Sequence, residues 1–190
     1  MSFNRPPIKN VIEKTMTIIV IMCALMLYKK AEGREFELGA GYHQVKMDWL
    51  KGAKFKHNLT VIEGTYWNKY NLGLRAQYNI NESIVNDRGA RYFGDIEHKL
   101  YSLYSLQTLY RYKGIEIGAT YNAYKECYSN AKGYSDYCNS DDDYGYTVGY
   151  AYKLPKDFSV RINYNYIYQK DKLDDEEVTT SWSLTVVKPF

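Results

Sequence analysis

Histidine and serine residues are the first candidates for chemistry in this 190-residue chain. A nucleophilic hydrolase or acyltransferase needs a Ser hydroxyl, a His base and a carboxylate that orients the base, all within hydrogen-bond reach. The chain has three histidines, His43, His57 and His98, and the best pairing along the sequence joins His98 to Ser102 or Ser105. All three lie near the expected ends of loops, where a histidine is commonly a solvated residue. We therefore expect no catalytic residue.

Cys127 and Cys138 are the two cysteines outside the apolar N-terminal segment, which holds Cys23. An even pair in an exported chain predicts a disulfide, and the short loop between the two residues suits a staple. A metal site built from two thiols with no histidine nearby would lack ligands. We expect a disulfide here, and neither a metal nor a cofactor.

Isolated charges occupy the polar sides of strand-like segments, and these residues could also have a chemical role. They include Glu37, Arg75, Arg111, Glu116 and Arg161. If these segments close around a common interior, opposite charges there either neutralise one another or gate a narrow pore. We favour the structural role, because an interior of eight strands is filled by its own side chains.

Acidic runs at 141–143 and 174–177 fall in expected long loops. Carboxylates at this density could bind divalent cations, but the spacing lacks the Gly and Glu of a calcium-binding loop. We interpret both runs as solvated loop residues.

Eight segments alternate between apolar and polar residues with the period of two that a strand with two unlike faces requires. They span residues 34–43, 59–67, 72–80, 100–112, 115–124, 144–154, 158–169 and 178–190. Short links at 68–71, 113–114 and 155–157 join some of these segments. Longer links near 44–58, 81–99, 125–143 and 170–177 join the others. Short turns at one end and long loops at the other describe an all-β, up-and-down antiparallel sheet with an even number of strands.

Tyrosine decides which face of this sheet points outward. All but one of the 22 tyrosines follow residue 33, and many form rows such as Tyr164 and Tyr166, whereas the opposite face carries Gly, Ser, Thr and Asn. A soluble ligand-carrying barrel would turn the apolar face inward, but the interior of eight strands cannot hold aromatic rows from every strand. The rows therefore face outward into lipid, and in the fourth segment this places Leu100 and Tyr104 outside. The result is an eight-stranded antiparallel transmembrane β-barrel over residues 34–190, compatible with a mean hydropathy of −0.53 because only alternate residues meet lipid.

The N-terminal residues differ from the rest in charge and hydropathy. Residues 15–28 form an apolar run preceded by basic residues, too short for a typical spanning helix but typical of a secretory signal. We expect a signal peptide over residues 1–33, with an uncleaved anchor as the alternative. The formal charge of +3 resides in this segment, so the folded part is balanced, which argues against a nucleic-acid partner.

The last strand carries a specific resemblance. The segment VTTSWSLTVVKPF ends in Phe190, with Trp182, Leu184 and Val186 at alternate positions before it. Together with the eight segments, it resembles the small eight-stranded outer-membrane β-barrel proteins of Gram-negative bacteria, the porin-like and opacity-protein group. In that family such an ending resembles the signal read by the outer-membrane insertion machinery. Lys188 departs from it at a position that is usually apolar or aromatic, and Pro189 is unusual.

The resemblance implies a monomeric protein of the bacterial outer membrane, in contact with lipid and lipopolysaccharide. The leading functional hypothesis is a structural or surface-interaction role, with an extracellular ligand bound by the four long loops. The alternatives are a small porin-like channel and, third, a lipid-modifying enzyme of the outer membrane.

Overall fold

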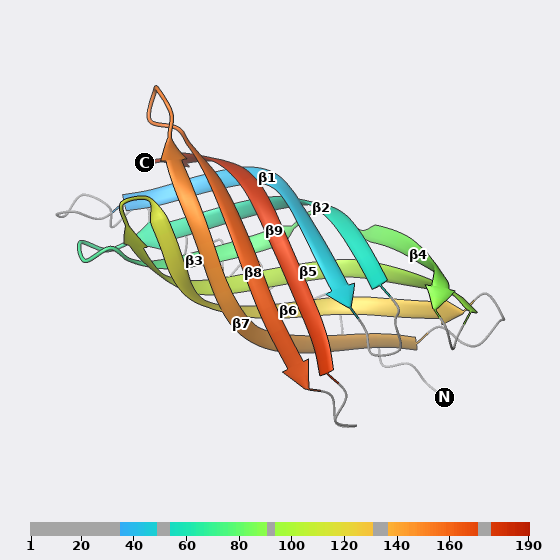
Figure 1. Cartoon of the computed structure of the whole chain (residues 1–190). Helices are drawn as coiled ribbons and strands as arrows, with labels where there is room; N and C mark the ends of the chain where they lie inside the picture. Colours follow the sequence, from blue (N-terminus) through green and yellow to red (C-terminus); the bar gives the residue numbers. More distant parts are fainter. Residues whose placement is uncertain (1–34, 49–53, 91–93, 131–136, 171–175) are drawn as a thin grey trace, which may run out of the picture.

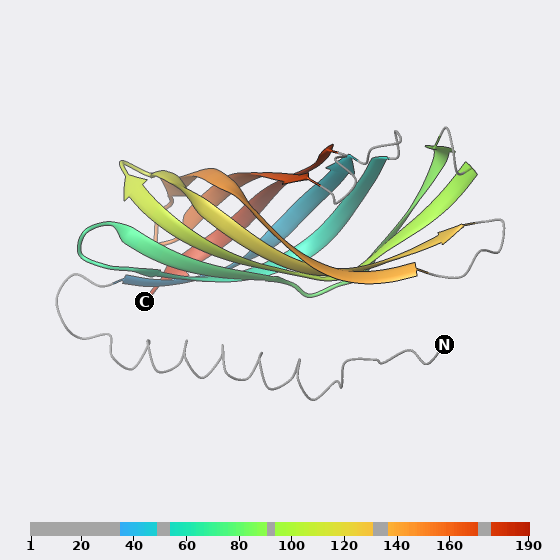
Figure 2. The ribbon, with the colours of Figure 1, turned by 90° about the horizontal axis from the view of Figure 1, so that it is seen from below.

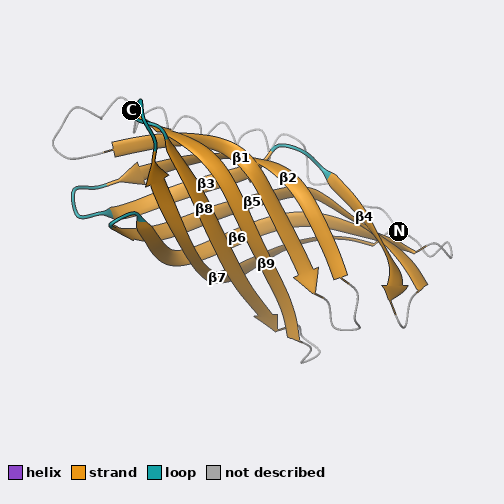
Figure 3. Ribbon diagram, turned by 45° about the horizontal axis from the view of Figure 1, so that its top comes forward, coloured by secondary structure: helices purple, strands orange, loops and turns teal. Residues whose placement is uncertain are grey.

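The structure, a computed structural model, describes residues 35–48, 54–90, 94–130, 137–170 and 176–190 (Figure 1). The predicted signal peptide over residues 1–33 lies outside the described residues. Within the described ranges, no helix is long and apolar enough to cross a membrane. Figure 3 shows that strands and the turns between them make up the described chain.

Nine strands follow one another along the chain. They are β1 (Glu35–Asp48), β2 (Lys54–Trp67), β3 (Leu72–Asn79), β4 (Ser83–Ala90), β5 (Gly94–Tyr112), β6 (Ile115–Asn130), β7 (Tyr137–Lys153), β8 (Ser159–Lys170) and β9 (Glu176–Pro189). Their order in the sheet is β3-β2-β1-β9-β8-β7-β6-β5-β4, and the paired strands run antiparallel. Neighbours in sequence are thus mostly neighbours in space, as an up-and-down sheet requires.

A pairing between β3 and β5 closes the sheet. Leu72–Tyr78 of β3 face Tyr104–Tyr110 of β5, so eight strands form a closed antiparallel barrel. The predicted fold class is confirmed. β4 is an additional strand outside the eight-stranded barrel. It pairs with β5 alone, and the β4–β5 hairpin extends beyond the barrel body (Figure 2). The prediction of a loop at 81–99 is therefore wrong, because most of these residues form the β4–β5 hairpin.

The three short connections lie at the same end of the barrel as the C-terminus, which we call the turn end (Figure 1). Each contains residues with left-handed backbone: Asn71 (φ 61°), Lys113 (φ 48°) followed by Gly114 (φ 86°), and Lys156 (φ 64°) followed by Asp157 (φ 60°). Tight hairpin turns need positive φ because it matches the twist of the flanking strands. We call the opposite end the loop end.

The two faces of the barrel divide as the alternation predicts. Polar side chains point into the lumen, where Arg75, Glu116 and Arg161 are 0% exposed, while Ile62 and Ile162 on the outer surface are 45% and 54% exposed. The outer tyrosines are exposed in the same way. A surface this apolar is stable only in lipid.

Near the loop end the two faces of the sheet exchange polarity, so apolar residues point inward and charged residues outward. The strands also run further than predicted. The inward residues of β1 and β2 are now the apolar Val45, Met47, Phe55 and Leu59, each at most 3% exposed. Their outward neighbours are charged and exposed: Lys46, Asp48, Lys54 and Lys56. The expected loop at 44–58 is thus largely strand, because the pairing continues where the outer surface leaves lipid and meets water.

A bulge in β5 corrects the predicted orientation of Leu100. The register between β5 and β6 shifts between Leu100 and Ser102, so the inward and outward positions exchange there. Leu100 is 1% exposed and points into the lumen, not to the outer face. In the lumen it packs with Leu103, Phe55 and Met47 in an internal apolar cluster. One extra residue in a strand has this effect because side chains alternate with a strict period of two.

The expected loop at 125–143 is also mostly strand, and it contains the two cysteines. β6 and β7 pair as far as Tyr128 and Tyr137, with Cys127 directly opposite Cys138. Their Sγ atoms are joined in a disulfide across the hairpin. The bond therefore staples two strands that are already paired.

Replacing both cysteines by serine is expected to lower the free energy of unfolding by about 2–3 kcal/mol, the loop-closure entropy of so short a segment. Urea titration of the barrel in lipid vesicles, with and without a phosphine reductant, measures this. The reductant should shift the midpoint of the native protein and leave that of the double-serine variant unchanged. Equal shifts in both would contradict the expectation.

Candidate functional site

The centre of the lumen at the turn end is a network of ion pairs organised around Arg161 of β8. Its guanidinium contacts Glu37 of β1, Glu63 of β2 and Glu116 of β6, with 3.2 Å between Nε and the Glu116 carboxylate. All four side chains are 5% exposed or less. One residue thus connects three strands across the interior.

Arg75 of β3 forms the second part of this network. It pairs with Glu116, and it also donates to Thr65 Oγ1 at 3.0 Å and to the side-chain oxygens of Gln107 and Asn163 at 3.1 Å. The guanidinium therefore has partners on four other strands. Hydrogen bonds of this kind are what a fully buried charge requires.

Arg111 of β5 closes the network toward the turn end. It lies 2.8 Å from both Glu37 and Glu116, and its guanidinium carbon stacks 3.8 Å from the centroid of the Trp67 ring. The indole Nε1 of Trp67 donates to Glu37 at 2.9 Å. Arg111 is 18% exposed, so it separates the buried charges from water at this end.

The structure brings together all five residues predicted for the lumen: Glu37, Arg75, Arg111, Glu116 and Arg161. It adds Glu63 and Trp67, which sequence reasoning missed as members of the network. Glu63 was visible on the polar side of segment 59–67, but that segment has the least regular alternation. With Glu63 included, three arginines face three glutamates, so the buried charge is balanced.

Above the charges lies a layer of amides and hydroxyls that continues the hydrogen-bond network. Gln77 donates to Glu63 at 2.8 Å, and Gln107 donates to Gln77 and Asn165 at 3.2 Å each. Asn165 in turn donates to Ser181 Oγ at 3.0 Å. Side chains from opposite walls therefore meet in the lumen next to the charged layer.

The three histidines are buried, which corrects their interpretation as solvated loop residues. His43, His57 and His98 are 1%, 0% and 0% exposed. His98 does not pair with Ser102 or Ser105: its ring nitrogens lie 2.6 Å from His57 Nε2 and 3.1 Å from Glu126. These residues form a chain across β2, β5 and β6, in the part of the barrel where the outward neighbours of His57 are Lys56 and Asn58.

Acidification is expected to destabilise the barrel through His57, which lies beyond the lipid-facing belt. Burial, and after it the charge of His98, lowers the pKa of His57 from 6.5 to about 3. The unfolded chain therefore takes up a proton near pH 6.5 that the folded protein does not accept, so stability present above that pH is lost as the pH falls. The loss at His57 should be about 3 kcal/mol between pH 7 and pH 4.

Urea titrations of the native protein and of His57→Gln at both pH values isolate this contribution, since His43 and the carboxylates are common to the two proteins. The variant should lose about 3 kcal/mol less than the native protein over the same pH interval. An identical loss in both proteins would show that His57 titrates normally.

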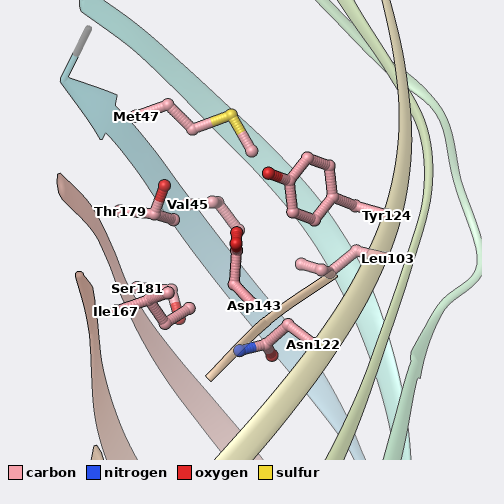
Figure 4. Close-up of a pocket in the computed structure, with 9 residues that line it drawn as sticks. All are labelled: Val45, Met47, Leu103, Asn122, Tyr124, Asp143, Ile167, Thr179 and Ser181. Carbon is pink, nitrogen blue, oxygen red and sulfur yellow. The ribbon is translucent and has the colours of Figure 1, made fainter. Parts of the chain in front are cut away.

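A small cavity lies in the lumen between the amide layer and the apolar cluster. Figure 4 shows side chains from opposite walls pointing into it: Val45, Met47, Leu103, Asn122, Tyr124, Asp143, Ile167, Thr179 and Ser181. Its volume is about 10 Å³, enough for one water molecule. Asp143, expected as a solvated loop residue, is buried here on β7, whereas Asp174 and Asp175 lie outside the described residues.

A polar cluster on the outer surface marks the upper limit of the lipid-facing belt. Gln44 of β1 lies between Trp182 and Asn58 in the pairing register. Trp182 Nε1 donates to Gln44 Oε1 at 3.0 Å, and Gln44 Nε2 donates to Asn58 at 2.9 Å and to Tyr42 at 3.0 Å. Two register steps further, on the same face, Lys46 and Lys56 stand directly opposite each other.

The residues predicted as an insertion signal lie on the outer face of β9. Trp182, Leu184, Val186 and Phe190 are 37–52% exposed, and Lys188 shares their face. The last residue is fixed by a backbone hydrogen bond from Phe190 N to Phe36 O at 2.8 Å. The closing strand thus presents one continuous row to the surroundings.

Comparisons with known proteins agree with this geometry. A family model described as "outer membrane protein beta-barrel domain" matches residues 15–190. Among solved structures, Ail of Yersinia pestis in complex with the heparin analogue sucrose octasulfate is similar (TM-score 0.56, 17% identity, 84% of this chain and all of that one). Neisserial surface protein A is similar as well (TM-score 0.59, 16% identity, 84% and 100% coverage). At these identities the likeness concerns the fold alone. No curated protein sequence matches the chain.

Proposed function

The chain belongs to the outer membrane protein β-barrel family, and from this premise we propose that it is a surface-interaction protein whose loop end forms the binding surface. It is a protein of the bacterial outer membrane, and its strands cross the bilayer with the turn end in the periplasm and the loop end outside, the arrangement general to such barrels. We propose that the row Trp182, Leu184, Val186 and Phe190 is read by the insertion machinery during assembly.

The observation that carries the proposal is the construction of the loop end. Residues 45–48, 54–59, 83–90, 94–100, 124–130 and 137–142, here named the extracellular platform, continue as paired strands beyond the lipid-facing belt. An internal apolar cluster supports them, and the disulfide fixes the β6–β7 hairpin. A rigid surface held above the membrane favours binding, because little conformational entropy is lost when a ligand docks.

One pair of facing lysines on this platform supports an anionic ligand. Lys46 and Lys56 face each other directly across β1 and β2, and Lys54 follows on the same face. Like charges placed directly opposite destabilise a sheet, and an anion between them relieves the repulsion. Ail, a barrel of the same fold, has been solved with a heparin analogue. We propose a sulfated or phosphorylated saccharide as the ligand class for this chain.

Binding of sucrose octasulfate to the purified barrel in nanodiscs tests the proposal by calorimetry. The native protein should bind the probe, with affinity falling as salt is raised, and the variant Lys46→Gln/Lys56→Gln should lose about tenfold or more in affinity, from two charge contacts. The matched control Lys153→Gln/Lys156→Gln removes two lysines at the opposite end and should bind normally. Equal binding by all three proteins would overturn the proposal.

The channel and enzyme alternatives make different predictions. The balanced layer of three arginines and three glutamates favours a closed lumen, so planar bilayers containing the protein should show no steady ion conductance. Steady conductance would favour the channel. Altered lipid A acylation in cells that make the protein would favour the enzyme.

A further inference from the structure

Four exposed lysines form a ring around the turn end, where Lys153 at the end of β7 adds a fifth positive charge. Lys69 lies in the β2–β3 turn, Lys113 in the β5–β6 turn and Lys156 in the β7–β8 turn, and Lys188 lies near the end of β9. Among the eight barrel strands, β1 alone neither carries one of these lysines nor borders a turn that does, so the lysines are distributed over the whole rim. All four are exposed. We call them the periplasmic lysine collar.

Aromatic rings place three of these ammonium groups at the level of the membrane surface. Lys69 Nζ lies 5.2 Å from the centroid of the Tyr70 ring, and Lys113 Nζ lies 5.3 Å from that of Tyr112. Lys188 Nζ lies 5.8 Å and 5.4 Å from the rings of Phe158 and Phe190. Aromatic residues of a membrane barrel gather at the headgroup boundary, and lysines extend from there toward the phosphates.

Two collar residues occupy turn positions where Gly or Asn is the more usual residue. Lys113 and Lys156 both have left-handed backbone, a conformation that Gly and Asn adopt more readily than a residue with a long side chain. The β2–β3 turn uses Asn71 at such a position. Residues kept in an unfavourable conformation are commonly there for function rather than stability.

The collar is not neutralised by nearby carboxylates. In the described part of the chain, no ion pair joins any of the four lysines to an acidic side chain. Glu35, at the same rim, lies 3.7 Å from Arg111 instead, and Asp157 is the other acidic residue of the turns. Four lysines against these two carboxylates leave a positive rim that is open to anions.

We propose that the periplasmic lysine collar binds the phosphate headgroups of anionic glycerophospholipids in the periplasmic leaflet, and that this contact fixes the depth of the barrel in the membrane. The lipid supplies negative charge at the height of the ammonium groups, and each lysine close to such a surface is attracted to it. The collar also gives a reason for Lys188, whose charge interrupts the apolar row of β9. This inference does not depend on the extracellular ligand.

Spin-labelled lipids in phosphatidylcholine vesicles that contain the barrel measure the contact. Electron paramagnetic resonance should show that labelled phosphatidylglycerol is enriched about threefold over labelled phosphatidylcholine in the lipid shell of the native protein, and that high salt reduces the enrichment. In the variant Lys69→Gln/Lys113→Asn/Lys156→Asn/Lys188→Gln the ratio should fall close to one. Asn at the two turn positions keeps their left-handed backbone favourable.

A matched variant with four outer substitutions, Lys46→Gln, Lys54→Gln, Lys56→Gln and Lys99→Gln, removes the same charge from the opposite end. It should keep most of the native enrichment. Circular dichroism and heat-dependent gel mobility confirm that each variant is folded before the ratio is read. An unchanged ratio in the collar variant, or its loss in the outer variant, would overturn the proposal.

Discussion

Replacing Arg161 by methionine is expected to lower the free energy of unfolding of the barrel by about 3–5 kcal/mol, the usual effect of removing one partner from a buried ion pair. Three carboxylates contact this guanidinium, and Arg161 is the one arginine that pairs with Glu63 in the described structure. Without it, Glu63 keeps Gln77 and Thr185 as hydrogen-bond donors but has no ion-pair partner. Urea titration in lipid vesicles, followed by tryptophan fluorescence, measures the loss.

Two further variants separate charge from volume. In Arg161→Met/Glu63→Gln the carboxylate left without a cation is neutralised, so part of the loss should be recovered. Arg111→Met removes a charge from the more exposed edge of the same network and should be milder than Arg161→Met. If Arg161→Met were as stable as the native protein, the network would not hold the lumen together.

Replacing Gly118 by valine is expected to abolish assembly of the barrel. A Cβ atom at this position would lie 1.8 Å from the carbonyl oxygen of Thr108 and 3.1 Å from the Cα of Leu109, both on the main chain of β5. A side-chain rotation cannot relieve such contacts, so β5 and β6 would have to separate. Gly in a barrel strand commonly marks such a close approach of two backbones.

The folded fraction, read from heat-dependent gel mobility after refolding into vesicles, checks this prediction. Ala119→Val is the matched control, because the next residue faces outward and is exposed, and it should assemble like the native protein. Gly118→Ala adds the same Cβ atom and should also fail to assemble. Normal assembly of Gly118→Val would mean that the strands lie further apart here than the structure places them.

The alternating pattern predicted the barrel body because lipid and lumen impose opposite demands on successive residues. That logic located the three turns, the outer tyrosines and the five lumenal charges, Arg161 among them. It failed where the outer surface leaves lipid. There, Val45 and Phe55 turn inward and Lys46 and Lys56 outward, the pattern of a soluble barrel, so the expected alternation breaks off and predicts a loop at residues 44–58.

The hydropathy pattern also cannot predict two local features, the bulge in β5 and the contact between His57 and His98. The bulge next to Leu100 exchanges inside and outside without any change in composition, so a periodic pattern cannot locate it. His57 and His98 lie far apart in the sequence and come together only through the pairing of their strands. A clue for His57 was its place between Lys56 and Asn58, since two polar outward neighbours leave the histidine facing inward.

The reversal of polarity at the loop end has a kinetic consequence. A barrel enters the outer membrane from the periplasm, so the extracellular platform must cross the hydrocarbon layer before the lipid-facing belt can settle in it. Lys46, Lys54 and Lys56 point outward on the first hairpin, and a lysine on the lipid face costs about 2–4 kcal/mol at the bilayer midplane. For β1 and β2, the largest free-energy barrier to insertion is therefore the passage of this hairpin through the hydrocarbon layer. A bilayer that is locally thinned at the point of entry would lower this barrier.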